Sequence, residues 1–168
     1  MTTPISETLR SRVTVPRLDL DWSGALAKIS EAETYLVATV SPAGRPHAVP
    51  VLAVWVTDTL VFNTEVSARK ARHLVQNPAV AVSVAGEKYD FTIEGTAEQL
   101  VDTAALQAVA DAFPRKYAWW HPQVIDGHFV ADDPGIIRAV YAIHPEQIFG
   151  FGKTKGFSAT RWRFPTVL

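Results

Sequence analysis

The sequence of 168 residues contains no cysteine and a single methionine. The missing thiols exclude a disulfide framework, a thiolate metal site and a cysteine nucleophile, and their absence fits a reducing cytoplasm. An excess of one charge is also lacking, because 16 basic residues are balanced by 17 acidic ones, for a formal net charge of -1. No global positive field therefore favours nucleic acid or an anionic membrane as a partner.

Long apolar runs are missing too. Nowhere do about 18 apolar residues follow one another, as a transmembrane helix requires, and the N-terminus has no signal-peptide core. With 48% hydrophobic residues, the chain is nevertheless long enough for one globular domain with a substantial core. We expect an irregular N-terminal arm over residues 1–20, a single domain over residues 21–168, and a cytoplasmic protein.

The spacing of apolar residues predicts two or three helices among short strands. Helical periodicity over Trp22 to Ala32 and after Asp102 predicts amphipathic helices, and TEVSARKARHLVQNP predicts another. Alternation of period two is clearest from Tyr89 to Glu98. The remaining strands are predicted at Thr34 to Val40, His47 to Val56, Thr59 to Asn63, Val80 to Val84, Ile137 to Ile143 and Ala159 to Phe164.

The gaps between the first strands are only of hairpin length, with Pro42 and Gly44 in one and Thr57-Asp58 in the next. Parallel crossovers would need a helix in those gaps. The residues alone therefore favour a mainly β (α+β) fold, a small antiparallel barrel of six or seven strands with flanking helices. The stretch from Arg115 to Gly135 is predicted to be a long aromatic-rich loop, and FGFGKTKG is expected to link the last strands.

The helix within TEVSARKARHLVQNP begins with cations at the end where the helix dipole disfavours them. If Ser67 is the N-cap, Arg69 and Lys70 fall in the first turn, at a cost of roughly 0.3–1 kcal/mol each. A strand ending at Asn63 and Thr64, a short turn and a helix start together form a recurrent phosphate cradle, because free amides and hydroxyls converge there. The stretch therefore predicts an anion site.

These residues also have simpler interpretations. Glu65 could pair with Arg69 and leave the other cations on a solvated face. Pro50 cannot donate to a ladder, so it lies either at a plain edge or where another group approaches. Trp119 and Trp120 could wall a planar ring or only pack in a core or interface. The five histidines are scattered, so no metal site is predicted.

The order of several segments resembles a known family. The sequence contains SPAGRPHAVPV, then LVFNT, then Ala68-Arg69-Lys70 and NPAVAVSV. In this arrangement it resembles the split-barrel flavoproteins related to pyridoxamine 5'-phosphate oxidase, from about Tyr35 to Val101, with a weaker similarity in FSATRWRF. The resemblance implies a homodimer of split β-barrels that binds FMN or coenzyme F420 at the dimer interface.

The resemblance also implies which residues touch the cofactor. Thr64, Arg69 and Lys70 would hold the phosphate. Ala68 stands where the family often has serine, so the hydroxyl contact is either missing or supplied by Ser67. Family members often bring a C-terminal Trp or Arg toward the partner's ring, which here suggests Trp162. Further contacts are expected from Asn63 and, along the ribityl chain and ring, from His47, Ala48, Val49 and Pro50.

The implied function is an oxidoreductase that moves a hydride between the cofactor and a small unsaturated or heteroaromatic substrate, without a conventional catalytic base. We favour F420 over FMN because the hairpin and SARKARHL look closest to deazaflavin-using members. Alternatives are an FMN-dependent B6-vitamer oxidase, a flavin reductase, or a non-catalytic cofactor carrier. The C-terminal FSATRWRFPTVL lacks the Arg and His pair that grips the vitamer phosphate in the oxidases, which disfavours that activity.

Overall fold

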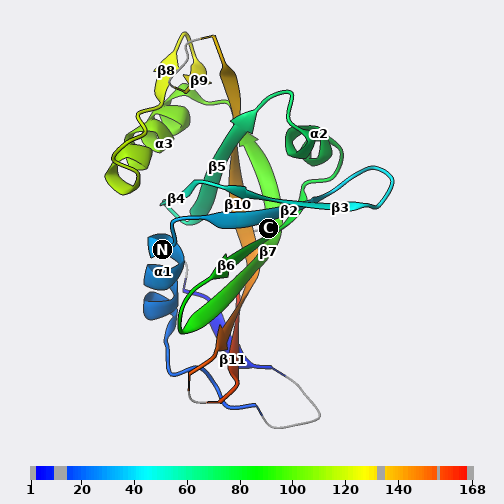
Figure 1. The fold of residues 1–168 in the computed structure, drawn as a ribbon, viewed down its shortest axis with the longest axis vertical. Helices are drawn as coiled ribbons and strands as arrows, with labels where there is room; N and C mark the ends of the chain where they lie inside the picture. Colours follow the sequence, from blue (N-terminus) through cyan, green and yellow to red (C-terminus); the bar gives the residue numbers. More distant parts are fainter. Residues whose placement is uncertain (1–2, 10–14, 132–134, 155, 166–168) are drawn as a thin grey trace.

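The computed structural model describes residues 3–9, 15–131, 135–154 and 156–165. Its strands form one antiparallel sheet of 11 strands, and its helices pack against that sheet (Figure 1). This arrangement confirms the predicted mainly β split-barrel fold, with 11 strands among the described residues rather than the six or seven expected. None of the helices among the described residues is long and apolar enough to cross a membrane.

The main path of the sheet runs in the order β1-β11-β10-β7-β6-β2-β3. These strands are β1 (Ile5–Thr8), β11 (Ser158–Arg163), β10 (Ile137–Gly152), β7 (Tyr89–Leu100), β6 (Ala79–Ala85), β2 (Tyr35–Val40) and β3 (Pro46–Val51). The other strands branch from β10. β5 (Thr59–Glu65) pairs with β10 and with β4 (Ala53–Val56), and β9 (His128–Val130) pairs with β10 and with β8 (Gln123–Ile125).

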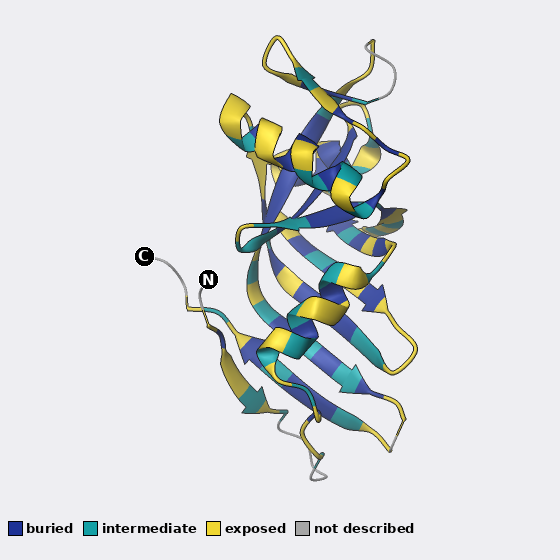
Figure 2. Cartoon of the chain, turned by 90° about the vertical axis from the view of Figure 1, so that its left-hand side faces the viewer, coloured by how far each residue is buried: buried dark blue, intermediate teal, exposed yellow. Residues whose placement is uncertain are grey.

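The helices are α1 (Trp22–Glu31), α2 (Arg69–Gln76) and α3 (Thr103–Lys116). α1 and α3 begin at aspartate N-caps, since Asp21 and Asp102 accept the backbone N–H of the residue three positions on, each at 2.8 Å. Figure 2 shows that the buried residues gather in the sheet and on the helix sides that face it.

β5 and β10 are buried on both faces, because they separate two hydrophobic clusters. Tyr141 and Ile143 of β10 join the cluster that α1 and α2 cover, whereas Val140 and Ala142 join the cluster that α3 covers. A strand that is buried on both sides is a nearly continuous apolar run, as VYAI is here. Both helix layers therefore depend on the same two strands.

β10 also bends where it passes β7. The register between the two strands shifts between Pro145 and Gln147, which marks a bulge. Opposite the bulge, a Cβ on Gly95 would lie 2.1 Å from the carbonyl oxygen of His144. Only glycine allows the two backbones to approach so closely. This steric requirement explains why a glycine stands at position 95 within the alternating pattern of the strand.

Several predicted boundaries were wrong. The strand expected from His47 to Val56 divides at Leu52 into β3 and β4, which pair with different neighbours. The segment Phe149 to Gly152 lies inside β10 rather than in a linking loop. The region expected as a loop from Arg115 contains the end of α3 and the β8–β9 hairpin. Only the extent of β10 depends on pairing with a distant segment, β7, whereas β2–β3, β4–β5 and β8–β9 are local hairpins.

The region expected as an N-terminal arm takes part in the fold. β1 pairs with β11 from the opposite end of the chain, and the Leu18 side chain is buried in the cluster that α1 and α2 cover. Leu18 is also held by its backbone N–H, which donates to the Thr160 hydroxyl at 3.0 Å.

Lys116, at the end of α3, joins that helix to β2 and β4. Its ammonium group donates to the Tyr35 hydroxyl at 2.7 Å and to the Ala53 carbonyl at 2.9 Å. The charge lies 4.5 Å from the centre of the Tyr35 ring and 5.1 Å from that of Tyr117. Burial lowers the pKa of Lys116 to about 8.

This pKa predicts how stability changes with pH. Between pH 8 and about 9.5, below the range in which tyrosines titrate, the unfolded chain still holds the Lys116 proton while the folded chain has lost it. Stability rises with pH wherever the unfolded state binds more protons. The free energy of unfolding of the wild type should therefore rise over this range relative to Lys116→Met, measured by urea denaturation. The exposed Lys88→Met is the control and should keep the wild-type slope; equal slopes in all three proteins would refute this role of Lys116.

Candidate functional site

The start of α2 lies where β5 ends. A turn of Val66 to Ala68 joins the two elements, and the N-cap is Ala68 rather than the expected Ser67, so no side chain caps the helix. The first backbone amides of a helix have no acceptor within it, and the first turn here contains no acidic residue. Arg69 and Lys70 occupy that turn. The helix thus begins with free donors and two cations.

Two polar side chains are buried at the end of β5. Asn63 is 7% exposed and Thr64 is 4% exposed. Asn63 accepts a hydrogen bond of 2.6 Å from the guanidinium of Arg138, which β10 brings beside this strand. The Thr64 hydroxyl has no hydrogen-bond partner within the described parts of the chain. The Thr64 oxygen does not belong to the fully buried polar atoms that lack a partner, so the hydroxyl is accessible and can bond a group from outside the chain.

Arg138 adds a third cation close to the helix start. Burial lowers the pKa of Lys70, the positive charge of Arg138 lowers it further, and Glu65 opposes both effects. Glu65 makes no ion pair with Arg69 within the described residues, so the simpler interpretation that these two charges pair is not supported. A bound anion would relieve the mutual repulsion of the cations.

β3 forms the free edge of the main sheet path, beside α2. His47 and Val49 face the inner side of the strand and are half-buried, whereas Ala48 and Pro50 face outward and are exposed. Pro50 therefore lies on an edge strand, as one interpretation of this proline predicted. The four residues predicted to follow a cofactor accordingly form one accessible edge.

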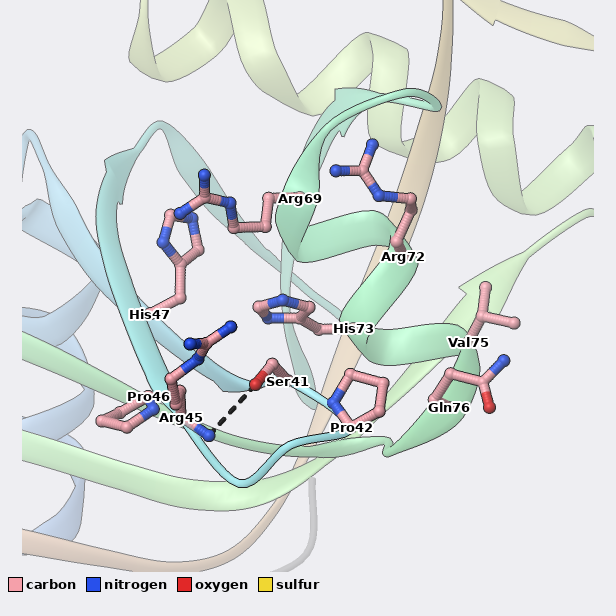
Figure 3. A pocket seen from close by; sticks show the side chains of 10 residues that line it. All are labelled: Ser41, Pro42, Arg45, Pro46, His47, Arg69, Arg72, His73, Val75 and Gln76. Carbon is pink, nitrogen blue, oxygen red and sulfur yellow. Dashed lines mark hydrogen bonds between the residues drawn. The ribbon is translucent and has the colours of Figure 1, made fainter.

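An open cleft of about 830 Å³ separates the β2–β3 hairpin from α2. Figure 3 shows Arg69 reaching toward His47 from the helix, while Arg45 reaches up from the hairpin turn toward His73. None of the described residues that line the cleft carries a carboxylate. A second cavity of similar size, about 810 Å³, is lined by Asp58, Glu98, Glu146 and other residues. The first cleft is therefore the one suited to an anion.

Two histidines meet inside the basic cleft. The rings of His47 and His73 are perpendicular with centres 5.7 Å apart, and the buried His73 has its Nδ1 atom 3.0 Å from the Thr39 hydroxyl. Burial lowers the pKa of His47, and the charges of Arg69, His73 and Lys70 lower it further. An anion bound here would favour the protonated form of His47.

The structure brings most of the predicted site residues together, with Trp162 apart. Ser67 lies on the exposed turn before α2, and its carbonyl accepts a hydrogen bond from Arg72. Trp162 is 1% exposed and packs on β11 in the hydrophobic cluster, 6.0 Å from the ring of Trp22. Its side chain therefore does not reach the cleft of its own chain.

The aromatic residues of the Arg115 to Gly135 region also lie apart from the cleft. Trp120 is buried and packs edge-on against Phe113 with ring centres 4.6 Å apart, which supports the packing interpretation for this residue. Trp119 is 69% exposed. No cluster of potential metal ligands occurs among the described residues.

Three basic residues of the site were missed by sequence reasoning. Arg138 comes from a strand about 70 positions away, and only the β5–β10 pairing places it there. His73 follows Arg69 by one helical turn, so helical spacing would have found it once the helix was predicted. Arg45 stands in the same hairpin as His47. The signal that could have identified Arg45 in the sequence was its position in the turn of this hairpin.

Comparison with known proteins gives a consistent result. The sequence profile of the pyridoxamine 5'-phosphate oxidase family matches residues 25–151. A pyridoxine/pyridoxamine 5'-phosphate oxidase from Bacteroides thetaiotaomicron is 36% identical over 77 residues, which make up 44% of this chain and 36% of that protein. The match therefore spans well under half of the relative's length.

Solved structures share the fold. A proposed 5-nitroimidazole antibiotic resistance protein from Bacteroides thetaiotaomicron superposes with a TM-score of 0.64 at 16% identity, over 94% of this chain and 90% of that one. An F420 reductase superposes with a TM-score of 0.55 at 20% identity, over 73% of this chain and 93% of that one. At such identities the likeness concerns the fold alone.

Proposed function

Because this chain belongs to the pyridoxamine 5'-phosphate oxidase family, we propose that it is an oxidoreductase with a flavin-type cofactor, FMN or coenzyme F420. It would transfer a hydride between the cofactor and a small unsaturated or heteroaromatic substrate. One observation carries the proposal: the start of α2 combines uncapped amides, two cations and the Thr64 hydroxyl, which has no partner among the described residues. These groups fit a phosphate, which both cofactors contain.

Each residue has a role in this proposal. Arg69, Lys70 and the first amides of α2 bind the phosphate, and the Thr64 hydroxyl donates a hydrogen bond to it. Arg138 holds Asn63 in place at 2.6 Å. The edge of β3 contacts the remainder of the cofactor through His47, Ala48, Val49 and Pro50.

The cofactor supplies the redox chemistry when it is bound, since its ring accepts or releases the hydride. The chain supplies binding, orientation and the exclusion of water. His47 is a titratable imidazole on β3, and burial and then the nearby charges of Arg69 and Lys70 lower its pKa. In this proposal it donates a hydrogen bond to a bound ring or substrate. Among the described residues that line the cleft, none is a carboxylate that could act as a general base.

The proposal includes a homodimer in which a second copy covers the outer face of β2, β3 and β6. The residues that point outward on these strands carry no charge and are mostly small. The β-sheet register places Ala38 beside both Ala48 and Ala81, and Leu36 beside Pro50 and Ser83. Leu36 is 44% exposed although it is a large apolar side chain.

This face is suited to packing against another sheet. Uncharged small side chains let two sheets approach to about 10 Å, and an exposed apolar face on a sheet typically marks an interface. The same face carries Ala48 and Pro50, two of the residues assigned to the cofactor. A second copy would therefore also exclude water from the bound ring.

The phosphate site predicts the effect of one charge reversal. Lys70→Glu should weaken the binding of FMN or F420 more than tenfold, a loss above about 1.4 kcal/mol, because it places a carboxylate beside the anion. Affinity is measured by fluorescence titration, and the melting temperature shows that the fold is intact. Lys88→Glu makes the same charge change on the distant β6–β7 turn and should bind normally. Unchanged affinity in Lys70→Glu would mean that this cation is only solvated.

The dimer face predicts a second result. Leu36→Glu should convert the dimer into monomers, as measured by light scattering after size exclusion, because it would bury a carboxylate in an apolar interface. The cofactor should bind more weakly to the monomer. Val101→Glu, which alters another exposed apolar side chain outside these strands, should remain dimeric. A Leu36→Glu protein that stays dimeric would exclude this face as the interface.

A further inference from the structure

The buried face of α2 carries a histidine between apolar residues. The buried residues of this helix are Ala71, His73 and Leu74, and His73 is only 6% exposed. Burying a polar imidazole costs free energy unless the ring is hydrogen-bonded, whereas an apolar side chain would fill the same space without that requirement. His73 also lines the cleft. Its presence therefore points to a role beyond packing.

His73 belongs to a short chain of hydrogen bonds that ends at β3. Its Nδ1 atom lies 3.0 Å from the hydroxyl of Thr39, a fully buried residue of β2. The same hydroxyl donates to the carbonyl oxygen of His47 at 3.5 Å. Because a hydroxyl has a single hydrogen to donate, Thr39 accepts its other bond from the Nδ1–H of His73. The chain links α2, through β2, to the backbone of His47.

The rings of the two histidines are also in contact. They meet edge to face, with their planes at 82° and their centres 5.7 Å apart. Figure 3 shows His73 reaching from α2 toward the β2–β3 hairpin, with His47 on the other side of the cleft. His73 therefore acts on both the backbone and the ring of His47. Without it, the His47 ring would be free to change rotamer.

The surroundings of His47 make its rotamer matter. Arg69 and Lys70 lie near it on α2, and Arg45 lines the same cleft from the hairpin turn. Burial lowers the pKa of His47, and the neighbouring positive charges, that of Arg69 foremost, lower it further. At neutral pH the ring is therefore largely uncharged, with one N–H donor and one acceptor nitrogen. The rotamer decides which of these two atoms faces a ligand.

We propose that His73 is a positioning residue for His47, which it holds in the orientation that turns a ring N–H toward the bound ligand. Thr39 in turn fixes His73. The partner of this N–H is an uncharged acceptor on the ligand, a carbonyl oxygen or a ring nitrogen. The inference rests on the proposed function for the ligand itself, the flavin-type cofactor or its substrate. It adds how the chain orients the donor that meets that ligand.

A double-mutant cycle tests whether His73 acts through His47. Calorimetry measures the binding of FMN, F420 and inorganic phosphate to the wild type, His73→Asn, His47→Ala and the double variant. His73→Asn should bind the cofactor about two- to tenfold more weakly, the range of one hydrogen bond, and should bind inorganic phosphate normally. In the His47→Ala background the same substitution should have no further effect. The control His144→Asn replaces an exposed histidine outside the cleft and should match the wild type.

NMR of the cofactor-free protein gives a second readout. The wild type should show a nuclear Overhauser effect between the ring protons of His47 and His73. Thr39→Val, which removes the hydroxyl and keeps the shape of the side chain, should weaken it. In His73→Asn, His47 should titrate at a higher pH than in the wild type, since one of the charges that lower its pKa is gone. Melting temperatures show whether each variant is folded.

Each outcome supports or overturns the proposal. A loss in His73→Asn that persists in the His47→Ala background would overturn it, because His73 would then contact the ligand itself. An equal loss for inorganic phosphate would also overturn it, because the substitution would have displaced α2. So would unchanged cofactor affinity, or a nuclear Overhauser effect that Thr39→Val leaves intact. If neither cofactor binds, the proposed function fails, and the NMR measurements alone decide whether His73 positions His47.

Discussion

The fold depends on the pairing of β10 with its neighbours. This strand of 16 residues is hydrogen-bonded to β7 along most of its length, to β5 and β9 near its start, and to β11 near its end. Its two faces belong to different hydrophobic clusters, so the layers under α1 and α3 meet in it. The β5–β10 pairing fixes the end of β5, and with it the turn into α2 and the position of Arg138. The position of the site therefore depends on the pairing of β5 with β10.

The electrostatics of the site follow from what the chain leaves unsatisfied. α2 has no side-chain N-cap and no acidic residue in its first turn, although α1 and α3 both have aspartate caps. Cations gather at the positive end of the α2 dipole, and their repulsion adds to burial in lowering the pKa values of Lys70 and His47. Such an arrangement costs stability in the free chain and favours an anion at this point. A functional site is where local rules of this kind are typically broken.

Much of the fold could be predicted from the sequence, because alternation and turn residues report local structure. The hairpin at Thr57-Asp58, the helix after Asp102 and the alternation of β7 were all predicted in this way. The division of β3 from β4 was not, since one apolar run contains both strands and only their different partners, β2 and β5, separate them. The extent of β10 was not, since it depends on long-range pairing with β7. In the site, Arg69 and Lys70 were identified from their conflict with the helix dipole. Arg138 was missed because only the pairing of β10 with β5 brings it close to these two residues. Trp162 was assigned to the site by resemblance alone.

The central claim is that this cleft holds a flavin-type cofactor by its phosphate. The most direct measurement is a spectroscopic and mass analysis of the purified chain, followed by titration with FMN and with F420. The account predicts that one of the two binds at one molecule per chain and that inorganic phosphate competes with it. A protein that binds neither cofactor, or binds one with an affinity that phosphate does not change, would contradict the account.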